Sequence, residues 1–409
     1  MPIFQPELSR TTSFKIKGGN KMKKFSFLFA SLFLLAACGP TAGGGASGAG
    51  NKTEGETIKI GTNLELSGDV SAYGNAEKEG ITLAVEEINA SGGVLGKKLE
   101  LIEKDNKSEN GEATSVAANL TAKDKVVAVI GPATSGATKA TIPNMTKAAV
   151  PVITPSGTDD SITLVNDKVQ EYIFRACFQD TFQGVILANF AQDNLKAKNV
   201  VIIGDNSSDY AIGLTKSFKD TFKGKIAKEE TFTAGDKDFQ AILTKIKDLD
   251  YDAIYIPGYY SEAGLIIKQA REMGIDKPIL GADGFGDEKL VEIAGAKNVS
   301  EVYYTGHFSE KAPATDKVKP FVEAFKKKYD KQPSAFNALG YDSVYMLKQA
   351  IEDKDSADSK EITEGLASLK DFVGVTGKMT MDKDHNPEKS AVVLGLTEGK
   401  ETSADAVNP

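Results

Sequence analysis

Two loops rich in small and hydroxyl-bearing residues are the first stretches of this sequence that could do chemistry. Residues 132–138 read PATSGAT and residues 154–160 read TPSGTDD, and each includes or follows the end of a short apolar segment. Where such a loop leads into a helix, backbone N–H groups and a hydroxyl such as that of Ser135 can bind an anion. The loops are therefore candidate carboxylate sites, although each taken alone is more often just a helix cap.

These loops lack the signatures of a nucleotide site. No Gly-Lys-Ser or Gly-Lys-Thr follows either loop, and no G-x-G-x-x-G pattern follows a predicted strand. Both signatures serve to place backbone N–H groups around phosphates. A nucleotide is therefore disfavoured, and a small carboxylate fits better.

A complementary negative charge occurs far along the chain. Residues 279–287 read ILGADGFGD, which places Asp283 directly after a short apolar strand and among glycines. An acid at the carboxyl end of a strand that faces a cleft could bind an ammonium group. The alternative is an aspartate that only shapes a turn.

Tyrosines at predicted loop positions could supply the wall of a binding pocket, because the ring is apolar and its rim is polar. Any one of them alone is more often a surface or core residue. These tyrosines are Tyr73, Tyr210, Tyr259, Tyr260 and Tyr341.

The scarcity of histidine and cysteine excludes much enzyme chemistry. His307 and His385 are the only histidines, and Cys38 and Cys177 are the only cysteines. Two dispersed histidines supply neither a metal site nor a nucleophile with its base. We therefore expect no catalytic residue, no metal and no cofactor. We expect Cys177 to be a small buried side chain without a disulfide partner.

The N-terminal segment resembles that of bacterial lipoproteins. Lys21, Lys23 and Lys24 precede an apolar run over residues 25–37, which is too short to span a bilayer and ends in Leu-Ala-Ala before Cys38. The resemblance implies a leader and lipoprotein signal peptide over residues 1–37, a lipid on Cys38, and a flexible tether over residues 38–56. The alternative is an ordinary signal peptide with an incidental cysteine. Since residues 1–21 fit no signal peptide, Met22 is a candidate start.

Length and composition limit the number of domains and the kinds of partner of the rest of the chain. About 350 residues remain after the leader and tether, enough for two domains. The formal net charge is −8 and no basic patch stands out in the sequence, which argues against a nucleic-acid partner.

Short β-branched segments alternate with amphipathic ones along the chain. The predicted strands are residues 57–64, 98–105, 126–131, 150–154, 199–205, 226–232 and 252–258, with one more short strand just before Asp283. The predicted helices are residues 74–93, 109–123, 135–148, 238–248, 260–273, 316–329 and 335–351, with one more beginning near Ser208. The strands show little polar alternation, so we expect an α/β fold with parallel sheets that are buried on both faces. Two such runs, divided near residues 175–180, predict two Rossmann-like lobes. Ligands of such sheets bind beyond the carboxyl ends of the strands, where these loops lie.

The chain resembles the leucine/isoleucine/valine-binding proteins of ABC importers. The resemblance begins in residues 58–106 and continues, in order, through VIGPATSGAT, VITPSGT, FTAGDKDF, YIPGYYSEAGLIIKQAREMG and ILGADGFG. It extends from residue 57 to about residue 400. It implies the type I periplasmic-binding-protein fold, a two-lobed clamp with three crossovers. The lobes would comprise residues 57–177 with 308–371, and residues 178–307 with 372–409.

The resemblance also implies a set of ligand-binding residues. Ser135 would bind the α-carboxylate, the Ser156 carbonyl would accept from the ammonium, and Thr158 would contact both groups. Asp283 stands where well-known members carry a glutamate that binds the ammonium, so the second lobe would close further or use a water. The residues aligned with the side-chain pocket are Tyr73, Tyr210, Tyr259 and Tyr341.

The function that this resemblance implies is capture of extracellular branched-chain amino acids for an ABC permease with cytoplasmic ATPases. The protein would be a monomer, lipid-anchored on the outer face of the membrane of a bacterium without an outer membrane. The runner-up ligands are another small amino acid, an amide or a urea-like compound. A receptor ectodomain, an enzyme and an adhesin remain as less favoured classes.

Overall fold

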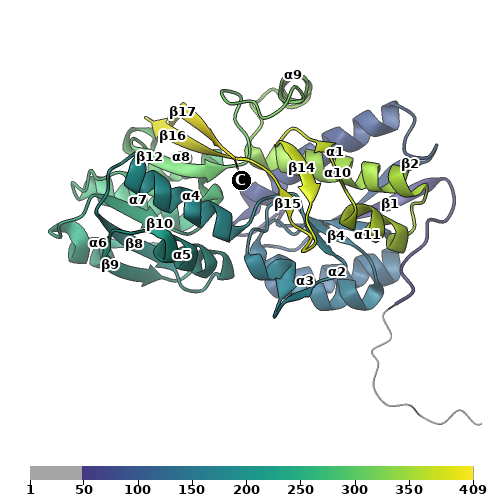
Figure 1. Ribbon diagram of the computed structural model, residues 1–409, viewed down its shortest axis with the longest axis horizontal. Helices are drawn as coiled ribbons and strands as arrows, with labels where there is room; N and C mark the ends of the chain where they lie inside the picture. Colours follow the sequence, from purple (N-terminus) through teal and green to yellow (C-terminus); the bar gives the residue numbers. More distant parts are fainter. Residues whose placement is uncertain (1–47, 409) are drawn as a thin grey trace, which may run out of the picture. The chain divides into compact units, whose positions relative to one another are not determined.

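The computed structural model describes residues 48–408, which contain two large sheets (Figure 1). The first sheet has five strands in the order β2-β1-β3-β4-β7, and every neighbouring pair in it is parallel. Its strands are β1 (Thr57–Leu64), β2 (Lys98–Asp105), β3 (Ala128–Ile130), β4 (Val152–Thr154) and β7 (Ile173–Arg175).

The second sheet has seven strands in the order β17-β16-β12-β11-β10-β8-β9. Strands β8 to β12 pair in parallel, whereas β16 and β17 add an antiparallel edge. Its strands are β8 (Asn199–Asp205), β9 (Lys225–Phe232), β10 (Ala253–Ile256), β11 (Ile279–Gly281), β12 (Val302–Gly306), β16 (Ala391–Thr397) and β17 (Lys400–Val407).

Helices cover both faces of each sheet. They are α1 (Ser71–Ala90), α2 (Asn110–Asn119), α3 (Ser135–Ala148), α4 (Asp180–Asp193), α5 (Asp209–Thr221), α6 (Gln240–Lys247), α7 (Tyr260–Glu272), α8 (Glu288–Ala294), α10 (Ala335–Lys354) and α11 (Ser359–Ala367), while α9 (Val318–Tyr329) packs against α1 and α10. Shorter elements are β5 (Leu164–Val165), β6 (Lys168–Val169), β13 (Phe372–Val373), β14 (Lys378–Met381), β15 (Pro387–Glu388) and the helical turns Leu120–Asp124, Asp160–Ile162, Asp283–Phe285 and Ala296–Asn298.

The buried faces explain why the strands lack alternation. In the first sheet, one face packs against α1, α10 and α11, and the other packs against α2 and α3. In the second, α4 and α5 cover one face, while α6, α7 and α8 cover the other. The predicted α/β class with doubly covered parallel sheets is confirmed.

Three segments connect the first lobe, built on the five-stranded sheet, with the second lobe, built on the seven-stranded sheet. They lie between β7 and α4, after β12, and between β15 and β16. The third connection lies later than predicted, because Phe372, Met379 and Met381 pack into the core of the first lobe. Residues 372–388 therefore belong to the first lobe, and only β16 and β17 return to the second.

Part of the predicted tether over residues 38–56 is bound to the first lobe. The Asn51 side-chain amide donates to the carbonyls of Thr121 (3.0 Å) and Val126 (2.8 Å), and its backbone N–H donates to Ser359. Thr53 binds Asp358. Residues 48–53 thus form an N-terminal strap on the first lobe, while Cys38 and the signal segment lie outside the described residues.

Among the described helices, none combines the length and apolarity needed to cross a membrane.

Candidate functional site

The loop after β3 begins α3 at Ser135, as the small residues of the loop predicted. The Glu65 carboxylate at the end of β1 accepts from the N–H groups of Ala133 (3.0 Å) and Thr134 (3.1 Å). Burial raises the pKa of Glu65, although these hydrogen bonds oppose the shift. Two of the N–H groups that the sequence predicted to be free are therefore already bound to Glu65. The Ser135 hydroxyl, at the first residue of α3, accepts from the Asp159 N–H at 3.1 Å.

The loop after β4 places Ser156 and Thr158 beside this helix start. The Ser156 hydroxyl lies 2.5 Å from Glu77 Oε1 and 2.9 Å from the Ala133 carbonyl oxygen. Burial also raises the pKa of Glu77 well above its usual range. The Ser156 side chain thus joins two loops of the first lobe.

Thr158 meets an acid that the sequence analysis missed. Asp180, the first residue of α4, donates its backbone N–H to the Thr158 carbonyl at 2.9 Å. Both side chains are fully buried, and Thr158 Oγ1 and Asp180 Oδ2 have no hydrogen-bond partner among the described residues. Burial, followed by repulsion from Asp283, raises the pKa of Asp180 well above its usual range. The feature of the sequence that could have identified Asp180 is its position just after the predicted lobe boundary.

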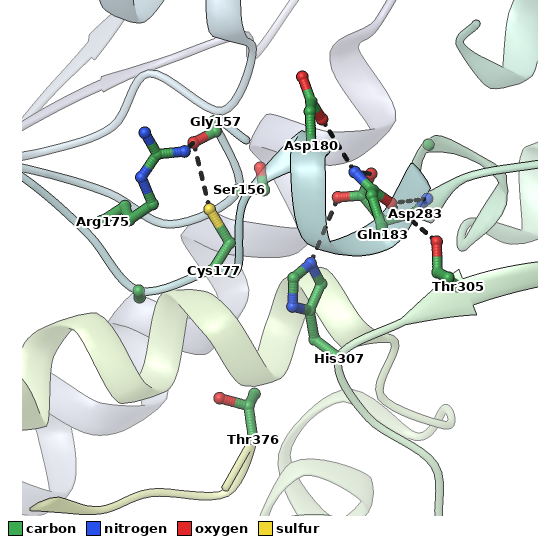
Figure 2. Close-up of polar contacts among 12 residues, drawn as sticks. Ser156, Gly157, Arg175, Cys177, Asp180, Gln183, Asp283, Thr305, His307 and Thr376 are labelled. Carbon is green, nitrogen blue, oxygen red and sulfur yellow. Dashed lines mark hydrogen bonds and ion pairs between the residues drawn. The ribbon is translucent and has the colours of Figure 1, made fainter. Parts of the chain in front are cut away.

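Asp283 is the centre of a buried polar network (Figure 2). Its Oδ1 accepts from the Tyr210 hydroxyl (2.7 Å) and from Gln183 Nε2 (3.0 Å). Gln183 Nε2 also lies 3.0 Å from Asp180 Oδ1, so one amide group bridges the two acids. The Gln183 carbonyl accepts from Thr305 Oγ1 (2.7 Å) and from the Asp283 N–H (3.2 Å), which fixes the amide orientation.

His307 completes this network from the second connecting segment. Its Nε2 lies 3.3 Å from Asp283 Oδ2, and its ring stacks on Phe178 at a centroid distance of 3.7 Å. Burial lowers the pKa of His307 to about 4, against an opposing contribution from Asp283. The imidazole is therefore neutral at physiological pH and contacts Asp283 by a hydrogen bond rather than as an ion pair.

Three predicted tyrosines gather next to Asp283. Tyr210 and Tyr259 stack at 4.9 Å between centroids, and Tyr73 packs edge-on to Tyr259 at 5.7 Å. The Tyr73 hydroxyl, from the first lobe, donates to the Gly284 carbonyl of the second lobe at 2.5 Å. Together the rings form an aromatic wall where the lobes meet.

Tyr341 does not join this wall. Its hydroxyl lies 2.6 Å from Glu87, and its ring packs against Phe321 at 4.9 Å. Phe336, on the same helix, instead packs against Tyr73 at 4.5 Å. Five residues along a helix rotate a side chain by about 140°, so the two positions face different surroundings.

The tight crossing of α1 and α10 brings Tyr73 and Phe336 together. A Cβ on Gly80 would lie 1.9 Å from the Asn337 carbonyl oxygen, and one on Gly340 would lie 2.4 Å from that of Glu77. Only glycine allows backbones this close.

The described residues contain no cluster of acids, histidines and cysteines that could hold a metal ion. Cys177 is buried as predicted, with its thiol 3.2 Å from the Gly157 carbonyl oxygen, and burial raises its pKa to about 12. This thiol is therefore neither ionised nor exposed.

Comparison with known proteins agrees with this architecture. The sequence model of a family described as periplasmic binding protein matches residues 57–401. The chain belongs to the periplasmic binding protein family. This membership places it among solute-binding proteins rather than enzymes.

The similar proteins include binding proteins for branched-chain amino acids. The chain is 31% identical over 331 residues to a leucine-, isoleucine-, valine-, threonine- and alanine-binding protein of Pseudomonas aeruginosa, covering 80% of this chain and 86% of that protein. The crystal structure of the branched-chain amino acid transporter substrate-binding protein LivJ from Streptococcus pneumoniae, in complex with isoleucine, is 51% identical. Its TM-score is 0.83, and the match covers 86% of this chain and all of that one. The leucine-binding protein LivK from Thermotoga maritima is 38% identical with a TM-score of 0.81, covering 86% of this chain and 99% of that one.

Proposed function

We propose that this protein captures branched-chain amino acids outside the cell and delivers them to an ABC transporter permease. The observation that carries the proposal is the pair of buried acids Asp180 and Asp283, of which Asp180 Oδ2 makes no hydrogen bond within normal geometry to a described residue and has the Thr158 hydroxyl near it. Burying polar atoms without hydrogen bonds is costly, so such a pair favours a ligand that brings donors. An α-ammonium group brings three.

The rest of the site supports an α-amino acid. The Ser135 hydroxyl at the start of α3 offers a binding point for the carboxylate, where the helix dipole favours negative charge. The ammonium would lie among Asp180, Asp283, Thr158 and the carbonyl of Ser156. Since Asp180 and Asp283 stand at the second lobe and Ser135 at the first, one zwitterion would contact both.

The aromatic wall supports an apolar side chain. Tyr73, Tyr210, Tyr259 and Phe336 offer rings but no charged partner, so a charged side chain would lose its hydration without compensation. Phe336 takes the place that Tyr341 held in the sequence-based set. The relatives named for leucine, isoleucine and valine favour these ligands over amides or urea-like compounds.

Calorimetry with leucine, isoleucine, valine, lysine and glutamate tests this function. We expect the three branched amino acids to bind, with valine no more than about 200-fold weaker than leucine, because a missing methylene costs roughly 1–3 kcal/mol. Lysine or glutamate binding as tightly as leucine would contradict the proposal.

We further propose that Cys38 carries a lipid that anchors the protein at the outer face of the cell membrane, as a monomer that meets its permease there. The Leu-Ala-Ala-Cys ending of a short apolar run supports this. We expect Cys38→Ala to abolish labelling by radioactive palmitate and to leave unprocessed precursor, whereas Cys177→Ala changes neither. Undiminished labelling of Cys38→Ala would exclude this anchor.

A further inference from the structure

A cavity lies at the edge of the first sheet where β1 begins. Its volume is about 340 Å³, and Lys52, Lys59 and Lys125 line it together with the N-terminal strap. From here β1 runs seven residue steps to Leu64, about 23 Å at a strand's usual rise, toward the loops of the ligand site. The cavity is therefore separate from that site.

The charges around this cavity are mostly unbalanced. Lys52, Lys59 and Lys125 are exposed, and none of them forms an ion pair with a described residue. Glu54 is the one acid among the residues that line the cavity. We call these three lysines and the strap beside them the basal surface.

Two further lysines extend the basal surface, and one more acid, Asp358, lies beside the strap. The Gly48 N–H donates to the Lys147 carbonyl at 2.8 Å, and Gly50 lies against the stem of Lys360. Both lysine side chains are exposed. Asp358 is engaged by the Thr53 N–H at 2.9 Å.

The strap fixes where the N-terminal segment meets the body. Asn51 and Thr53 bind the first lobe through both backbone and side-chain groups, so the chain reaches Gly48 at the basal surface. Cys38 precedes Gly48 by ten residues, which span at most about 35 Å when fully extended. A lipid on Cys38 would hold the basal surface close to a bilayer.

We propose that the basal surface docks on the anionic phospholipid surface of the membrane. This docking would add to the lipid anchor proposed at Cys38. It relies on that anchor only to keep the protein near a membrane in the cell. The chain as a whole is acidic, with a net charge of −8, but charges beyond a Debye length of about 10 Å are largely screened. The bilayer therefore interacts mainly with the lysines nearest to it. Docking in this orientation points the ligand-binding edge of the first sheet away from the bilayer.

The test uses residues 46–409, a compact unit that lacks Cys38, so its result does not depend on acylation. The solved LivJ chain from Streptococcus pneumoniae, whose match covers 86% of this chain and all of its own, folds without a counterpart to the remainder. Co-sedimentation is measured with vesicles of phosphatidylglycerol and phosphatidylcholine, and with phosphatidylcholine alone, at low and high salt. We expect binding only to the anionic vesicles, and a loss of that binding at high salt.

The decisive variant is K52Q/K59Q/K125Q. A lysine near an anionic surface contributes roughly a fivefold factor to the partition constant, so the triple variant should bind about 100-fold more weakly. The matched control is K223Q/K237Q/K247Q, three exposed lysines of the second lobe that form no ion pair with described residues. It changes the net charge equally and should bind as the parent does.

Three outcomes would overturn the proposal. They are equal losses in the two variants, no preference for anionic vesicles, and calorimetric binding of soluble glycerol phosphate without vesicle binding. Leucine affinity is measured in parallel and should be the same in all three proteins. A failure of leucine binding would count against the proposed function and leave the vesicle result unaffected.

Discussion

At the residue scale, the candidate site is two acids held apart by one amide. Gln183 can face Asp180 and Asp283 with its nitrogen only because Thr305 and the Asp283 N–H occupy its carbonyl. The amide supplies two N–H donors, which leaves Asp180 Oδ2 without a partner. Three buried atoms of the network make no hydrogen bond with a described residue, namely Asp180 Oδ2, Thr158 Oγ1 and His307 Nδ1, and the first two lie where we expect the cationic group of a ligand.

Asp180 provides the prediction at this scale. Asp180→Asn should lower leucine affinity at least about tenfold, because a charge-assisted hydrogen bond contributes roughly 1.5–3 kcal/mol. Because folding raises the pKa of Asp180, the folded state binds the proton more tightly than the unfolded state does. Asp180 therefore lowers the free energy of unfolding as the pH rises above the ordinary carboxyl range. Asp180→Asn should therefore stabilise the ligand-free protein at neutral pH.

Calorimetry in buffers of different ionisation enthalpy, together with thermal melting, tests both statements. The number of protons exchanged on leucine binding should differ between the parent and Asp180→Asn, because a bound ammonium group favours the ionised form of Asp180. Asp193→Asn, at the exposed far end of α4, is the control. Unchanged affinity with a lower melting temperature would mean that Asp180 only supports the fold.

At the element scale, α3 of the first lobe and α5 of the second are linked by a lysine. Lys139 Nζ lies 2.9 Å from Asp209 Oδ2 and 3.7 Å from Asp159 Oδ1. Both aspartates raise the pKa of Lys139 against the effect of its burial. Since α3 begins at Ser135 and α5 carries Tyr210, this link joins two helices that also position the site.

Lys139→Met should weaken contact between the lobes without altering any residue of the site. A partly exposed ion pair contributes about 0.2–1 kcal/mol, so leucine affinity should fall by up to roughly fivefold at low salt. The difference from the parent should shrink as salt is added, since salt screens the pair. Lys216→Met, which breaks a pair inside α5, serves as control. An equal effect of both substitutions would exclude a role for the link between lobes.

At the scale of the whole molecule, three connections join the two lobes. Lys389, in the third connection, donates from its buried ammonium group to the Ala176 carbonyl of the first at 3.0 Å. Burial lowers the pKa of Lys389 to about 8. The first and third connections are therefore tied to each other by this hydrogen bond.

We expect leucine to compact the protein, because a ligand that contacts both lobes stabilises only the closed arrangement. Small-angle scattering should show a smaller radius of gyration with saturating leucine. The Asp283→Ala variant, with affinity reduced at least about tenfold by the loss of a charge-assisted partner, should need correspondingly more leucine. No change of radius in the parent, at saturation verified by calorimetry, would contradict hinge closure.

The sequence by itself determined the local part of this structure. Segments such as 57–64, 135–148 and 199–205 form the predicted elements with the same bounds, because a β-branched run and the small residues that begin a helix are local features of the sequence. Asp283 and the loops at Ser135 and Thr158 were identifiable because they directly follow strands. Cys177 was identifiable as a buried thiol because it has no partner within the body.

Only the tertiary structure decided which distant residues meet. It separates Tyr341 from the aromatic wall and brings in Phe336, it adds Asp180 and Gln183 to Asp283, and it assigns residues 372–388 to the first lobe. It also gathers Lys52, Lys59 and Lys125, which are dispersed in a sequence without an evident basic patch. Each of these outcomes depends on helix rotation or on strand order. Both are set by packing between segments far apart in the chain, which local propensity does not encode.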